Sequence, residues 1–212
     1  MTLSEYQQEQ QEAFFMARRH LAATEAGLLQ RMGDRLADYH DYRRRLDAFL
    51  EAHFGEICRS SCYESRLSAC CSREGIVTFF ADVVINVLAS SPQILDAIQD
   101  RLSKPNTGFK CVYLGAAGCL WRVRPLGCAL FLCDAAENQV LASDADLNRR
   151  WQALREEAKR FRWPDRPVLF DDIEEWFLAA GYRSTLMYIN TSPGLLRVKR
   201  RAGAGTGPAN GS

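Results

Sequence analysis

Residues 111 to 133 read Cys111-Val-Tyr-Leu-Gly-Ala-Ala-Gly-Cys119-Leu-Trp-Arg-Val-Arg-Pro-Leu-Gly-Cys128-Ala-Leu-Phe-Leu-Cys133. The other four cysteines of the chain occur earlier, at Cys58, Cys62, Cys70 and Cys71. Cysteines that serve only as small buried hydrophobic residues would be scattered along the chain rather than confined to one region. Thiolates are soft ligands, and sets of four suit tetrahedral zinc or a four-iron cluster. We therefore predict that all eight cysteines bind a metal, either zinc ion or an iron–sulfur cluster.

The start of the chain is polar and resembles no secretory signal, because it has neither a basic nor an apolar region. We therefore expect a cytoplasmic protein. In a reducing compartment clustered cysteines are more often metal ligands than disulfides. The alternative is a disulfide-rich exported protein, which eight free thiols on the denatured, metal-stripped chain would exclude.

The composition is that of an ordinary globular protein. With 212 residues the chain can bury a core without covalent staples. A formal net charge of +1 creates no overall field that would attract nucleic acid or anionic lipid, so we expect neither partner. Residues 76–89 form the longest apolar segment, which is shorter than the roughly 20 residues that a membrane span needs.

The spacing of apolar residues predicts a mainly α fold, a helical domain with an irregular cysteine-rich metal-binding core and a few short strands. Helical structure is expected over residues 4–54, with an interruption at Arg43, and Gly27 and Gly33 leave open either a hairpin or one long bent helix. Further helices are expected over 78–89, 91–104, 126–136, 144–161 and 171–180. Short extended pieces are expected at 76–78 and on both sides of the Gly-Ala-Ala-Gly turn. Four regions follow: N-terminal helices (1–55), the cysteine cluster (56–140), C-terminal helices packed on it (141–195), and a basic, Gly/Ala-rich disordered tail (196–212).

The first helices carry an apolar stripe that includes Phe14 and Leu21. Such a stripe must be covered. The cysteine region, a protein partner, or a second copy of the chain in a homodimer could cover it.

The Arg124-Pro125 pair predicts the start of a helix. Proline fixes its own φ and biases the residue before it toward an extended conformation. Cys128 would then lie in the first turn, where helix-terminal amides favour a thiolate. Arg122 or Arg124 could offset the charge of the cluster, or either could simply lie on the surface. Because Cys128 and Cys133 are five residues apart, the helix must end or bend between them if both are ligands.

The order of these motifs resembles the YkgJ-type cysteine-cluster family, whose members are described as zinc- or iron-chelating domains. The resemblance covers residues 58–133, and its specific parts are the Cys70-Cys71 pair and the block Gly118-Cys119-x₄-Arg-Pro-x₂-Cys128. It implies that the clustered cysteines are the ligands, in a metal-binding protein of undefined biochemical role. This chain departs from the family pattern in the Cys58-x₃-Cys62 spacing.

By resemblance, a related cysteine cluster also occurs in flagellin lysine methylases. The alternative function is therefore an iron–sulfur redox or protein-modifying enzyme. No Ser/His/Asp set, phosphate-binding glycine loop or zinc-protease motif occurs in the sequence, and the catalytic residues are therefore unknown. The histidines His20, His40 and His53 precede the cysteines and are expected to be structural or solvated.

Several polar residues are expected on solvated faces. Asp82 and Asn86 lie four residues apart in an apolar helix, and exposure on its polar side is the simpler interpretation. The alternative for Asp82 is a supporting acceptor near the metal. The run Arg43-Arg44-Arg45 is balanced by nearby aspartates and is typical of a solvated face.

Overall fold

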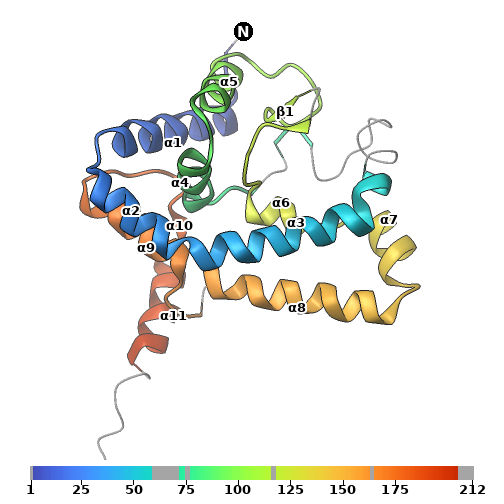
Figure 1. Ribbon diagram of the computed structural model, residues 1–212. Coiled ribbons are helices and arrows are strands. Elements are labelled where there is room, and N and C mark those ends of the chain that lie inside the picture. Colours follow the sequence, from blue (N-terminus) through green and yellow to red (C-terminus); the bar gives the residue numbers. More distant parts are fainter. Residues whose placement is uncertain (1, 59–71, 75–76, 116–117, 163–164, 205–212) are drawn as a thin grey trace, which may run out of the picture.

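The computed structural model describes residues 2–58, 72–74, 77–115, 118–162 and 165–204 (Figure 1). The helices are α1 Glu5–Ala22, α2 Ala26–Arg35, α3 Ala37–Cys58, α4 Phe80–Ala89, α5 Pro92–Leu102, α6 Leu126–Ala129, α7 Asp134–Ala136, the π-helix η2 Glu137–Leu141, α8 Ala145–Arg162, α9 Leu169–Ala179, α10 Tyr188–Thr191 and α11 Pro193–Ala204. The strands β1 (Leu114–Gly115) and β2 (Gly118–Cys119) form an antiparallel hairpin. The prediction of a mainly helical fold with few short strands is confirmed.

The long helices α3 and α8 lie side by side and run in opposite directions (Figure 1). Aromatic side chains fill the space between them. Phe49 of α3 stacks parallel to Trp151 of α8 with ring centroids 6.0 Å apart, and Tyr42 lies 5.3 Å from Phe161 by the same measure. Such ring pairs add to the free energy gained from burying their area. This pair of helices is the rigid base of the molecule.

Helix α4 is the centre of the fold. It packs against α1 on one side and α9 on another, and eight of its ten residues are buried. The apolar stripe of α1 predicted from the sequence is buried against α4 and α5, since Phe14 and Leu21 are almost fully covered. The stripe therefore packs within the chain. In addition, Gln7 of α1 donates from its side chain to the carbonyl oxygens of Leu102 (3.0 Å) and Lys104 (2.6 Å) at the end of α5.

Some predicted boundaries are confirmed. Helix α5 begins directly after Ser91 with proline in its first turn, and α8 covers the predicted 144–161 segment. Helix α9 is followed by Gly181, whose φ of 85° is readily adopted only by glycine. The N-terminal region is neither a hairpin of two helices nor one bent helix, because it breaks at residues 23–25 and at Leu36, with Gly27 and Gly33 inside α2. The predicted interruption at Arg43 is wrong, since α3 continues through it.

Other predictions are corrected. Val77 and Thr78 are not in a strand, and Ile76 lies outside the described residues. The predicted helix over 126–136 is interrupted. Helix α6 ends at Ala129, and helical structure resumes with α7 at Asp134 and η2 at Glu137. The first part of the predicted disordered tail is helical, since α11 extends to Ala204; residues 205–212 lie outside the described residues. No helix in the described ranges is long and apolar enough to cross a membrane.

Candidate metal centre

The β1–β2 hairpin places two cysteines close together. Cys111 precedes β1 and is buried, with its sulfur accepting a hydrogen bond from the Tyr113 N–H at 3.4 Å. Cys119 ends β2 and is exposed to solvent. Gly118 has a φ of 106°, a conformation that side chains with a Cβ rarely adopt, so the turn before Cys119 requires glycine. The hairpin therefore brings together residues eight positions apart in the sequence.

Cys128 lies in the first turn of α6, as the Arg124-Pro125 pair predicts. Pro125 is the residue before the helix, with φ −48° and ψ 138°, and Cys128 is the third residue of the helix. Helix α6 ends at Ala129, so Cys128 and Cys133 do not share a continuous helix. The geometric condition for both to be ligands, an end or bend between them, is met.

Asp82 of α4 fixes the start of α6. Its side chain is 2% exposed, and its two carboxylate oxygens accept hydrogen bonds from the N–H groups of Leu126 (3.0 Å) and Phe79 (3.1 Å). Burial raises the pKa of this carboxyl to about 6, although both hydrogen bonds stabilise the charged form. One buried carboxylate thus joins the first turn of α4 to the first turn of the helix that carries Cys128.

Asn86, one turn further along α4, fixes the segment before α6. Its side-chain oxygen accepts hydrogen bonds from the N–H groups of Arg122 (2.8 Å) and Val123 (3.3 Å). Because Asn86 is 1% exposed, the expectation that Asp82 and Asn86 lie on a solvated face is wrong. Buried polar groups need partners, and these two find them in the backbone of the cysteine segment. The signal in the sequence was a pair of polar residues inside an apolar helix.

Arg43 of α3 supports the same segment from the other side. Its guanidinium donates to the carbonyl oxygen of Arg124 at 2.6 Å and to Asp47 at 3.3 Å, and the residue is 2% exposed. Asp47 also accepts from the Arg124 side chain at 3.3 Å. The predicted solvated face is therefore correct for Arg44 and Arg45 and wrong for Arg43, which is buried.

The thiols of Cys111, Cys119 and Cys128 lie close enough to affect one another. Burial, together with the neighbouring Cys119, raises the pKa of Cys111 to about 12. Burial raises the pKa of Cys128 to about 12, and Asp82, Cys111 and Cys119 act in the same direction. The pKa of Cys119 is raised by desolvation as well, whereas Arg124 lowers the pKa values of both Cys119 and Cys128. Arg124 therefore lies where it can offset the charge of the cluster.

The other predicted ligands are distributed differently. Cys58 is exposed at the end of α3, and Cys133 is partly buried at the start of α7. Cys62, Cys70 and Cys71 lie outside the described residues. Ser72, which directly follows Cys71 in the sequence, forms an antiparallel bridge with Lys110, which directly precedes Cys111.

The described residues do not form a complete metal site. Within them, no group of three or more His, Cys, Asp or Glu side chains is arranged to hold a metal ion. What the structure brings together is three thiols with raised pKa values, which are protonated near neutral pH. Soft sulfur donors of this kind suit zinc or iron–sulfur clusters, which bind the thiolate form. The donor chemistry therefore fits the predicted metals, and the remaining ligands would have to come from elsewhere in the cluster.

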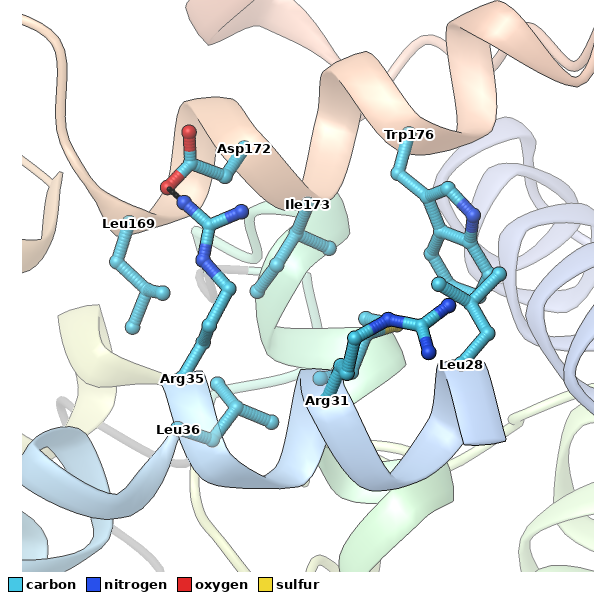
Figure 2. Close-up of a pocket in the computed structure, with 9 residues that line it drawn as sticks. Leu28, Arg31, Arg35, Leu36, Leu169, Asp172, Ile173 and Trp176 are labelled. Atoms are coloured by element: carbon cyan, nitrogen blue, oxygen red, sulfur yellow. Dashed lines mark hydrogen bonds and ion pairs between the residues drawn. The ribbon is translucent and has the colours of Figure 1, made fainter. Parts of the chain in front are cut away.

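A cavity lies between α2 and α9, away from the cysteines. The cavity has a volume of about 220 Å³ and is lined mainly by apolar side chains, among them Met32 and Ile173. Leu28 and Trp176 lie close together at one end, and Arg35 forms an ion pair with Asp172 at the other (Figure 2). Helix α2 buries none of its residues completely, so its apolar side is only half covered.

The histidines are structural, as expected. The ring of His20 lies 4.7 to 4.8 Å from the rings of Trp176, Phe177 and Tyr182, and burial lowers its pKa. His53 packs against Phe49 at 4.8 Å.

Comparison with known proteins identifies no relative: no family model, curated protein or solved structure matches this chain.

Proposed function

We propose that this protein binds a metal, zinc or an iron–sulfur cluster, through thiolates of its cysteine segment. The observation that supports the proposal is that Cys111 and Cys119 lie near enough to Cys128 for both to raise its pKa, as Cys119 also does for Cys111. A bound metal would replace the protons of these thiols, so that the sulfur atoms become thiolate ligands.

The fourth ligand of a four-coordinate site would come from Cys70 or Cys71. The bridge between Ser72 and Lys110 supports this assignment, because it joins the residue after Cys71 to the residue before Cys111. The order of motifs that resembles the YkgJ-type family supports the same ligands. Bound zinc would hold the cysteine segment together, whereas an iron–sulfur cluster would in addition carry an electron.

The chain's own residues would prepare this site. Asp82 and Asn86 hold the backbone on both sides of Pro125, and Arg43 fixes the carbonyl of Arg124. Arg124 would then balance part of the negative charge of the thiolates. The contacts from α3 and α4 would thus hold the backbone of the cysteine segment in place before any metal binds.

The test is purification without oxygen, followed by a visible spectrum and a measurement of zinc and iron per chain. Colourless protein with stoichiometric zinc would support a structural site. Brown protein with iron and absorption that dithionite bleaches would support a cluster. The proposal is overturned if protein loaded with either metal under reducing conditions loses it completely on desalting.

A further inference from the structure

A cleft of about 420 Å³ lies between α8 and the segment around α6, and none of its lining residues is a proposed metal ligand. One wall is formed by α8 residues spaced at three, four and three positions, so that they share one side of the helix: Gln152, Arg155, Lys159 and Arg162. The opposite wall includes Gly127, Leu130 and Phe131. Its volume is within the range of small-molecule sites and exceeds that of a lone inorganic phosphate.

The cleft carries positive charge that its own residues do not neutralise. Lys159 forms an ion pair with Glu156 at 2.5 Å, so the charges of these two residues cancel. Among the described residues, neither Arg155 nor Arg162 forms an ion pair or a hydrogen bond. The Nε of Arg162 is buried without a partner, and its guanidinium lies over the Phe79 ring at 5.6 Å. Two arginines that lack an ion-pair partner among the described residues therefore line one cleft.

An aromatic side chain stands beside these cations. Phe131 is 48% exposed, although a large apolar side chain gains by burial. An exposed ring at the edge of a cleft offers a face on which a planar group can stack. Guanidinium groups match the oxygen atoms of phosphate with paired hydrogen bonds.

We propose that the cleft between α6 and α8 binds a small phosphorylated molecule with a planar ring, of nucleotide size. The phosphates would bind between Arg155 and Arg162, and the ring would stack on Phe131. Because Gly127 lines the cleft and precedes Cys128, the ligand would lie next to the cysteine segment. The inference does not rest on metal binding, since none of the lining residues is a cysteine.

The test is isothermal titration of the full-length protein, as purified, with ADP, adenosine and inorganic pyrophosphate at low salt. We expect ADP to bind more tightly than either fragment, because only ADP contacts both parts of the cleft. Arg155→Gln and Phe131→Ala should each weaken ADP binding about tenfold, the scale of one lost charged or stacking contact. Both residues are exposed, so neither change should affect folding.

The matched controls are Arg149→Gln and Phe109→Ala. Arg149 is an exposed arginine of the same helix paired with Asp146, and Phe109 is 53% exposed; neither lines the cleft. Both controls should leave ADP affinity unchanged. The proposal is overturned if ADP does not bind at millimolar concentration, if adenosine binds as tightly as ADP, or if Arg149→Gln weakens binding as much as Arg155→Gln.

Discussion

The helical frame and the cysteine segment are held in place by different kinds of interaction. In the frame, helices such as α3 and α8 pack through stacked aromatic rings and buried apolar side chains. In the described part of the segment from Cys111 to Ala129, the regular structure is limited to two strands of two residues each and a single helical turn. Its backbone is instead held by buried polar side chains that reach across from the frame: Asp82, Asn86 and Arg43.

This difference explains which features the sequence revealed. Apolar periodicity predicts elements whose stability comes from burial, and it placed α5, α8 and α9 correctly. Proline and glycine chemistry predicted the start of α6 at Pro125 and the end of α9 at Gly181, because both effects are local. The segment from 126 to 136 was predicted as one helix, although α6 ends at Ala129, since apolar spacing does not show where the chain leaves helical geometry.

The polar supports were missed for a physical reason. A carboxylate or guanidinium within an amphipathic pattern is usually solvated, because burying it without partners is costly. The partners of Asp82, Asn86 and Arg43 in the cysteine segment are backbone groups some 36 to 81 positions away in the sequence. Only the folded structure brings those groups into reach. The eight-cysteine ligand set stays a prediction, with Cys111, Cys119 and Cys128 brought together and Cys62, Cys70 and Cys71 outside the described residues.

The largest expected effect is on metal content, and it should differ between variants of Cys119 and Cys133. Cys119→Ser should reduce bound metal per chain to less than about half and lower the melting temperature, because a thiolate ligand is lost. Cys133→Ser, at the start of α7, should keep more metal than Cys119→Ser. Metal analysis after desalting, together with a thermal melt, checks both. Equal metal in wild type and Cys119→Ser would contradict the assignment.

The next effect compares two neighbouring arginines. Arg43→Ala should lower the free energy of unfolding by about 3 kcal/mol, because a buried cation and its hydrogen bonds to the cysteine segment are removed. Arg44→Ala is the control, since the Arg44 side chain is 74% exposed, and its change should stay within about 0.5 kcal/mol. Urea unfolding of the two variants gives both values. A similarly small loss of unfolding free energy in both variants would mean that Arg43 does not support the cysteine segment.

Replacing Asp82 tests the link between α4 and α6. Asp82→Asn should cost about 2 kcal/mol of stability, because the amide nitrogen would face one of the two backbone N–H donors and leave it unsatisfied. Asp96→Asn, at a carboxylate that is 67% exposed, should change stability by less than about 0.5 kcal/mol. Equilibrium unfolding in urea measures both variants, and bound metal should fall in the first alone.

The smallest effect lies in the frame and depends on pH. Glu174 of α9 is fully buried, one of its oxygens accepts from the Asn190 N–H at 2.8 Å, and burial raises its pKa to about 7. Because the pKa is higher in the folded state, its stabilising contribution is complete below pH of about 4.5 and is lost as the pH rises through 7. Between pH 5 and 6.5 this loss should be about 1 kcal/mol per pH unit.

Glu174→Gln removes the titrating group and is the matched variant for that effect. The stability of wild type relative to Glu174→Gln, measured by urea unfolding at several pH values, should fall from pH 5 to pH 7. A difference that stays constant over this range would show that Glu174 does not titrate there, and the frame would then need no protonated carboxyl.

The most direct test of the account is X-ray absorption at the metal edge of protein purified without oxygen, which counts the sulfur atoms around the metal. We predict about four sulfur neighbours at roughly 2.3 Å, as expected for thiolate ligation, and about three in Cys128→Ser. A first shell made of nitrogen and oxygen alone, or a sulfur count that Cys128→Ser leaves unchanged, would contradict the claim that the converging cysteines form the metal site.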